Sequence, residues 1–372
     1  MSMNKVEAKN TMVVLGAGAS IGSKRYPKES SALESISKMP SSQHFFYDLF
    51  YQSATDRHSE RFINMLGMTY ERVNDLLVHA WGLTKNLNSF NIREWENINV
   101  QDVFTFLDVG EKMFNKGTRY YLAFSEAKEY LVDFIVMMLS MRCQNQHCER
   151  LRSIFFRLKP YDNIISLNWD TIADFTLDRI KIPQYKNYLK IMAEDRIHIR
   201  RYIRPGLFLK LHGSLNWIVC QNKACKDFGK PRLPLSKTRK KLPYLFSDAF
   251  EKCPRCKQKR PKRFIVPPVS NKLIHKDAFL HKLWLITLEK LVDTKRIVFI
   301  GYSFPPTDFY TEWLFRQTNF LVGNKPDIEV VNPEMFKEGS SVSKRYKTIF
   351  KKFNIIPYRT LAEYARKVGK YS

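Results

Sequence analysis

The sequence predicts an α/β protein in which a mainly parallel sheet is covered on both faces by helices. Short apolar runs recur along the chain, the first of them partly β-branched, and each ends in small or polar residues typical of a loop. Helical stretches follow most of these runs, and strands that alternate with helices form parallel sheets. Two pairs of closely spaced cysteines add a small metal-binding module to this prediction.

Residues 11–15 form a short apolar run that stops at a glycine-rich loop, which predicts a buried first strand. Further strands are expected at residues 164–167, 207–211, 297–300 and 328–331, and a helix at residues 307–320. Between the first two strands, residues 32–158 carry apolar side chains at three- and four-residue spacing, as in Val103, Phe104 and Leu107. We therefore expect a helical insertion there.

A chain of 372 residues that is 44% hydrophobic can bury a large core, in one large domain with insertions or in two domains. Its most apolar helical segment, residues 130–141, contains Asp133 and is too short to span a bilayer, and the N-terminus lacks the pattern of a secretory signal. We therefore expect a cytoplasmic protein with no membrane contact. Its six cysteines then need a role other than disulfide bonding.

The net charge of +26 is concentrated in two segments. Residues 221–264 hold 15 Lys and Arg against 3 Asp and Glu, and residues 337–372 hold 10 against 2. Such a field attracts polyanions, which include nucleic acid and acidic partner proteins. A solvated lysine-rich surface is the more frequent cause of such charge, so the charge does not decide the function.

The cysteine pairs are Cys220 with Cys225 and Cys253 with Cys256, separated by a basic segment of low periodicity. Four thiolates satisfy a closed tetrahedral zinc site, which stabilises a fold and leaves no ligand position open for catalysis. The alternative is a set of four free thiols. We expect a structural zinc ion.

A glycine-rich loop follows the first strand, formed by Gly16, Ala17, Gly18, Ala19 and Ser20. Such a loop lets backbone amides approach a pyrophosphate at the start of a helix. A hydride-transfer domain would have a third glycine where Ile21 stands, so that class is disfavoured. The alternative is a tight turn that binds no ligand.

Polar residues also follow the later strands, at the edge where open α/β sheets bind ligands. Asn168 and Asp170 follow the second strand and can hold a water, an amide or a ribose hydroxyl, although Asp170 can also cap the next helix. His212 follows the third strand and is a candidate general base. Three further residues are expected to hold ribose and adenine: Gly301, Ser303 and Asn332.

Taken in chain order, these elements resemble the sirtuin (silent information regulator two) family. Gly16–Ser20 is similar to its phosphate loop, and residues 167–170 are similar to its Gln-Asn-Ile-Asp motif. His212 matches its catalytic histidine, and the four cysteines match its zinc ribbon. Gly301-Tyr302-Ser303 resembles its ribose loop, and Val331-Asn332 resembles the end of its adenosine-side strand. The resemblance covers residues 11–20 and about 160–335. It implies a Rossmann-like parallel sheet, NAD as substrate, and Asn168, Asp170 and His212 as catalytic residues.

The resemblance also implies a domain organisation. Residues 1–31 would hold the first strand and the NAD phosphate loop, residues 32–158 the helical insertion, and residues 159–335 the remaining core with a zinc ribbon at about 218–262. Residues 336–372 form a basic C-terminal segment.

Two departures concern the activity. Sirtuin deacylases carry a Gly-Ile-Pro-x-Phe-Arg element after the first loop, but residues 21–27 of this chain have a different sequence. They also carry a Phe-Gly-Glu strand that binds the acyl-lysine peptide, and residues 264–268 differ from that strand. These stretches, with residues 211–217 and 301–308, resemble the sirtuin-like NAD hydrolases of bacterial anti-phage defence. The implied activity is NAD+ hydrolysis. The alternatives are NAD-dependent deacylation or ADP-ribosyl transfer, and a zinc-containing nucleic-acid-binding module with a non-catalytic NAD site.

The same resemblance implies partners. Sirtuin-like defence proteins of about this length are similar to those that assemble with a HerA-type hexameric ATPase, and the helical insertion offers amphipathic faces for a homo-oligomer. A freely active NAD hydrolase would exhaust the NAD of its own cell, so a low resting rate is expected.

Overall fold

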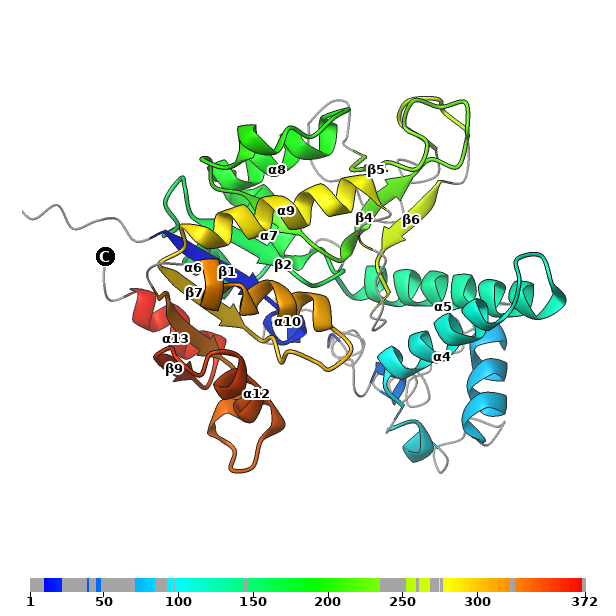
Figure 1. The fold of residues 1–372 in the computed structure, drawn as a ribbon, viewed down its shortest axis with the longest axis horizontal. Helices are drawn as coiled ribbons and strands as arrows, with labels where there is room; N and C mark the ends of the chain where they lie inside the picture. Colours follow the sequence, from blue (N-terminus) through cyan, green and yellow to red (C-terminus); the bar gives the residue numbers. More distant parts are fainter. Residues whose placement is uncertain are drawn as a thin grey trace, which may run out of the picture.

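The computed structural model describes residues 10–21, 39, 45–47, 71–83, 92–96, 98–143, 146–234, 252–258, 261–267, 274, 277–321 and 325–369. Its centre is a six-stranded sheet in the order β3-β2-β1-β7-β8-β9, with every neighbouring pair parallel (Figure 1). The strands are β1 (Thr11–Leu15), β2 (Asn163–Ser166), β3 (Phe208–Lys210), β7 (Arg296–Ile300), β8 (Asp327–Val331) and β9 (Ile355–Tyr358). The five strands expected from the sequence are therefore present, within one residue at most of their ends.

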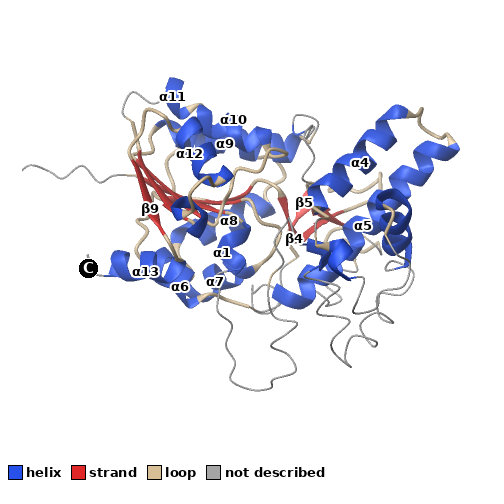
Figure 2. Ribbon diagram, turned by 90° about the horizontal axis from the view of Figure 1, so that it is seen from below, coloured by secondary structure: helices blue, strands red, loops and turns tan. Residues whose placement is uncertain are grey.

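Helices cover both faces of this sheet, which explains why its strands are mostly apolar. Figure 2 shows α9 (Ala278–Val292), α10 (Phe309–Arg316) and α12 (Ser341–Ile349) on one side of the sheet, and α6 (Glu149–Phe155), α7 (Ile172–Ile180) and α13 (Leu361–Gly369) on the other. All residues of β1, β2 and β3 are buried. In register, Leu15 lies beside both Ser166 and Ile300, so the carboxyl ends of β1, β2 and β7 lie level.

The C-terminal segment belongs to this sheet. Strand β9 pairs with β8 and forms an edge of the sheet, and α13 packs beside it. The Arg296 guanidinium on β7 donates to both carboxylate oxygens of Glu329 on β8 and to the Tyr364 hydroxyl on α13. The basic residues in 336–369 lie in α12, in α13 and in the loops beside them.

The described part of residues 32–158 is helical and contains no strand. It includes η2 (Ile92–Trp95), α4 (Val100–Met113), α5 (Arg119–Cys143) and a helix at residues 71–81. The Asn99 side chain accepts from the Gln101 amide and so fixes the start of α4. Helices α4 and α5 pack together at one end of the molecule (Figure 1).

A second, antiparallel sheet follows β3 and carries the cysteines. Its order is β5-β4-β6, formed by β4 (Gly213–Val219), β5 (Pro231–Arg232) and β6 (Lys262–Ile265). The remaining elements are α1 (Ala17–Ile21), α8 (Pro183–Ala193), η3 (Ile199–Tyr202), α11 (Thr318–Leu321) and η6 (Pro333–Phe336). Within the described ranges, every helix is too short or too polar to cross a membrane.

Candidate functional site

A cavity lies where the strand order of the main sheet reverses. The chain adds β2 and β3 on one side of β1, and then β7, β8 and β9 on the other. Ligands of open α/β sheets bind at such a point, beyond the carboxyl ends of the strands. The cavity has a volume of about 150 Å³ and opens to solvent. Its lining includes Gly16, Ala17, Ser20, Asn168, Asp170, His212, Gly301 and Ser303.

The sheet thus brings together most of the residues that the sequence predicted to bind or act on NAD. Gly18 and Ala19 pack beneath this surface rather than line it, and Asn332 also lies outside the lining. The Asn332 side chain accepts from the Glu334 amide at the start of η6 and donates to the Tyr302 carbonyl. Its described contacts are therefore those of a cap that joins the β8 and β7 loops.

The glycines of the first loop let it pack against the loop after β7. A Cβ at Gly16 would lie 2.5 Å from Tyr302 Cα, and one at Gly18 would lie 2.7 Å from Gly301 Cα. Gly301 has φ +64°, and its Cβ would lie 2.2 Å from the Ala19 amide nitrogen. Three loop amides, those of Gly16, Gly18 and Ala19, donate to backbone carbonyls. Ala17, in the same loop, is exposed in the cavity wall.

The Asn168 side chain is fixed by both hydrogens of its amide. Its Nδ2 donates to the Gly16 carbonyl at 2.8 Å and to the Ser20 hydroxyl at 3.1 Å. These contacts tie the end of β2 to the glycine loop. They leave the carbonyl oxygen Oδ1 as the hydrogen-bonding group that Asn168 offers to a ligand, and that atom is an acceptor.

Asp170 lies behind Asn168 and is buried. Its Oδ2 accepts from the Ser20 hydroxyl at 2.6 Å, and its Oδ1 accepts from the Ile172 amide at 3.0 Å, at the start of α7. Asp170 therefore takes part in the helix start and also lines the cavity. Burial raises the pKa of this carboxyl, although the nearby Lys210 ammonium and the two hydrogen bonds oppose that effect.

His212 has a defined tautomer. Its Nδ1 lies 3.1 Å from the Leu167 carbonyl oxygen, which can only accept, so Nδ1 carries a proton. Its Nε2 lies 3.4 Å from Asp308 Oδ1, and the other carboxylate oxygen of Asp308 accepts from the Tyr302 hydroxyl at 2.7 Å. Asp308 and Tyr302 were not selected from the sequence. Both could have been found from the sequence, because they lie in the same loop as the predicted site residues Gly301 and Ser303.

A buried ionic network supports the end of β2 and β3. The Lys210 ammonium donates to the Asp170 carbonyl at 2.6 Å and to Asp174 Oδ2 at 2.8 Å, and neither Lys210 nor Asp174 is exposed. The other carboxylate oxygen of Asp174 accepts from the Asn216 amide on β4. The network therefore joins α7, β3 and β4 directly behind the cavity.

The helical insertion forms part of the cavity wall. Val100 and Gln101 from the first turn of α4 and Leu139 from α5 all line the cavity. The Phe104 ring packs edge-on against Trp169, with 6.3 Å between the ring centres. Contacts between segments so distant in the sequence leave no pattern in the local sequence. The position of the insertion beside the cavity could therefore not be predicted.

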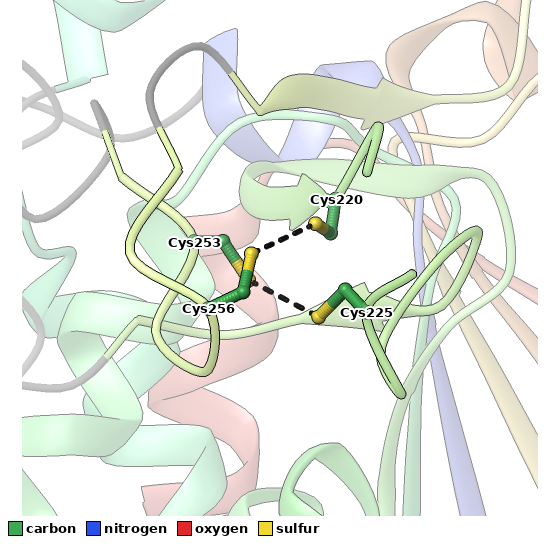
Figure 3. Close-up of side chains that lie close together, drawn as sticks. All are labelled: Cys220, Cys225, Cys253 and Cys256. Atoms are coloured by element: carbon green, nitrogen blue, oxygen red, sulfur yellow. Dashed lines mark hydrogen bonds between the residues drawn. The ribbon is translucent and has the colours of Figure 1, made fainter. Parts of the chain in front are cut away.

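The four predicted cysteines form one cluster that could hold a metal ion such as zinc (Figure 3). Their sulfur atoms all lie within 4.8 Å of one another, and the pairs Cys220–Cys256 and Cys225–Cys253 are separated by 3.6 and 3.9 Å. Four sulfurs at about 2.3 Å from a tetrahedral zinc ion lie about 3.8 Å apart. The donor set and its spacing therefore fit zinc, and all six cysteines of the chain are free thiols.

Charged residues connect this cluster to the rest of the fold. Asp227, four per cent exposed, pairs with Arg232 on β5 and with Arg255 between the second pair of cysteines. Asp195, near the end of α8, also pairs with both arginines. The module that holds the four cysteines is thus anchored to the main domain.

Several stretches of interest lie outside the described residues. They are residues 22–27 of the stretch after the glycine loop, residue 268 after β6, residues 235–251 of the basic segment and residues 370–372.

No protein-family model matches the chain, and no curated protein matches it at a significant level.

Proposed function

We propose that this protein is an NAD+ hydrolase that cleaves the bond between nicotinamide and ribose and releases nicotinamide and ADP-ribose. The observation that carries the proposal is the convergence of Asn168, His212 and the glycine loop on one cavity at the switch point of the sheet. If the six strands of the main sheet are numbered 1 to 6 as they occur along the chain, their order across the sheet is 3-2-1-4-5-6. This is the strand order of the Rossmann fold that binds dinucleotides.

The reaction needs little covalent help from the protein. The electrons of the bond between C1′ and the pyridinium nitrogen leave with nicotinamide, which departs as a neutral molecule and needs no acid. The ribose acquires oxocarbenium character, as in glycoside hydrolysis. A water molecule then bonds to C1′ and gives up a proton, so the site must position that water and accept the proton.

His212 is suited to accept the proton. Because Nδ1 is held as a donor by the Leu167 carbonyl, the basic nitrogen is Nε2, on the side of Asp308. A proton taken up at Nε2 places the imidazolium 3.4 Å from Asp308 Oδ1, within ion-pair distance. The Tyr302 hydroxyl holds Asp308 in place through the opposite oxygen.

Asn168 and Asp170 act on the positive sugar. Asn168 Oδ1 is suited to accept from the attacking water or from a ribose hydroxyl, because its amide hydrogens are already used. The Asp170 carboxylate is held by Ser20 and Ile172 and contributes negative potential in a buried site, where electrostatic interactions are strong.

The backbone beside the cavity favours water over an acyl-lysine peptide as acceptor. A peptide-gripping strand needs free backbone groups to pair with its substrate. At Val266, directly after β6, the amide donates to the His212 carbonyl and the carbonyl accepts from the Trp169 indole. Both backbone groups of Val266 thus have partners within the protein.

Zinc has a structural role in this proposal. Cys220, Cys225, Cys253 and Cys256 would hold it with four thiolates, which closes its coordination shell. The bound ion supplies folding energy to the β4–β6 module, and the reaction on NAD uses the chain's own side chains.

The resemblance to sirtuin-like defence proteins supports depletion of cellular NAD during phage infection as the biological outcome, with a HerA-type ATPase and further copies of this chain as partners. The basic segments would then be assembly or polyanion surfaces outside the cavity.

Isotope labelling tests the reaction and its acceptor together. The protein is incubated with NAD in water enriched in ¹⁸O, with an acetyl-lysine peptide present, and the products are analysed by mass spectrometry. We expect ADP-ribose that carries one ¹⁸O atom and an unchanged peptide. Consumption of the peptide with formation of acetyl-ADP-ribose would favour deacylation, and intact NAD under all conditions would refute the proposal.

A further inference from the structure

Gln101 is a buried polar residue in the cavity wall that the reaction described above does not use. It lies in the first turn of α4, is seven per cent exposed, and comes from the helical insertion rather than from the sheet. A polar side chain in such a place needs hydrogen-bond partners, because an unpaired buried amide is costly.

The carbonyl half of the Gln101 side chain has its partner. Its Oε1 accepts from the Thr307 hydroxyl in the loop after β7. The backbone of Gln101 is also fixed, since its amide donates to Asn99 and its carbonyl accepts from the Thr105 hydroxyl. The position and rotation of the side-chain amide are therefore set before any ligand binds.

The amine half has no partner among the residues that the structure describes. With Oε1 held by Thr307, the Nε2 group keeps two N–H donors at the cavity surface. A ligand that places an acceptor oxygen there would satisfy a nearly buried donor, which is a recurring way in which ligand sites obtain specificity.

The sequence neighbours of Thr307 locate this donor within the cavity. Thr307 directly precedes Asp308, whose carboxylate faces His212 Nε2 at 3.4 Å. The adenosine side is expected at the opposite end of the loop, near Gly301. The donor therefore lies at the end of the cavity where the glycosidic bond would be broken.

We infer that Gln101 is a ligand-binding residue whose side-chain amide donates to an acceptor oxygen on the nicotinamide riboside half of NAD. The inference rests on the proposed function, and it makes the helical insertion a part of the substrate site. An insertion that moved away from the sheet would remove this donor, so substrate binding and the position of α4 are linked.

Calorimetric binding tests the inference without turnover. The probe is carba-NAD, in which a methylene group replaces the oxygen of the nicotinamide-side ribose ring and blocks cleavage. We expect Gln101→Ala to weaken carba-NAD binding by about three- to tenfold, the cost of one hydrogen bond. Binding of adenosine monophosphate, which lacks the nicotinamide half, should be unchanged.

Gln101→Glu is the matched variant, because it keeps an acceptor for Thr307 and removes the amine donor. It should weaken carba-NAD binding at least as much as Gln101→Ala does. Thr307→Val keeps the donor but frees its rotation, so its loss should be smaller. Unchanged melting temperatures in these variants would exclude a folding defect as the cause.

The outcomes separate the two proposals. Wild-type affinity in both Gln101 variants, with carba-NAD bound by the wild type, would overturn the inference and leave NAD hydrolysis standing. An equal loss for adenosine monophosphate would also overturn it, because the effect would then be on the whole cavity. Failure of the wild type to bind carba-NAD or to cleave NAD would refute the proposed function itself.

Discussion

At the residue scale, the chemistry of the cavity depends on which hydrogen-bonding groups are already in use. The Asn168 amide is used by Gly16 and Ser20, and His212 Nδ1 is used by Leu167. Asn168 Oδ1 remains as an acceptor, and His212 Nε2 faces Asp308 Oδ1 at 3.4 Å. Both side chains were predicted as site residues from their residue type and position. Their hydrogen-bond partners in the structure determine which of their atoms face a ligand.

Replacement of Asp308 tests the pairing with His212. Asp308→Asn keeps an acceptor for the Tyr302 hydroxyl but removes the negative charge beside the imidazolium. We expect kcat for nicotinamide release to fall about ten- to a hundredfold, part of what a positioned general base contributes. Tyr302→Phe, which keeps the carboxylate and removes only its hydrogen bond, should fall less. Wild-type kcat in Asp308→Asn at saturating NAD would contradict this role.

Replacement of Lys210 tests the buried network behind the cavity. Lys210→Met leaves the Asp174 carboxylate buried without its ammonium, and breaking such a pair costs about 3–5 kcal/mol. Urea unfolding should show a loss of that size. The double variant Lys210→Met/Asp174→Asn removes both charges and should recover part of the loss. A double variant less stable than Lys210→Met alone would show that the ion pair is not the cause.

At the element scale, the sequence predicted those strands whose signal is local. Strand β1 and the four other predicted strands are short and mostly apolar, and all are present. Strand β9 lacks that signal, because it contains Pro357, is mostly half-exposed, and lies at the edge of the sheet. Contacts such as those of Gln101 and Phe104 with the sheet domain connect distant segments, and no periodicity in the sequence reports them.

Metal removal tests the module formed by β4, β5 and β6. We expect one zinc ion per chain by mass spectrometry, and a lower melting temperature after treatment with a chelator, because metal binding contributes to folding. Cys253→Ser should lose the metal, whereas Cys143→Ser, which lies outside the cluster, should keep it. Full stability and no bound metal in the purified wild type would favour four free thiols.

At the scale of the whole molecule, the proposed NAD hydrolase would have to be restrained in its own cell. The cavity wall is shared between the sheet domain and the helical insertion, so a change in their packing alters the site. The charge of +26 adds a field that attracts acidic partners. These features suit an enzyme whose activity depends on its state of assembly.

The expected outcome is a low rate of NAD cleavage for dilute protein, which rises as the protein assembles with itself or with a HerA-type ATPase. Light scattering after size-exclusion chromatography, paired with rate measurements on each fraction, checks this. A high rate in the monomer fraction would contradict it.

The central claim is that the residues gathered at the switch point of the sheet cleave NAD. The most direct measurement is nicotinamide release from NAD by the purified protein, alone and with an ATPase partner, in the wild type and in Asn168→Ala and His212→Ala. We predict release by the wild type that is lost in both variants, while all three proteins melt at similar temperatures. Release that persists in both variants, or no release by the wild type under either condition, would contradict the claim.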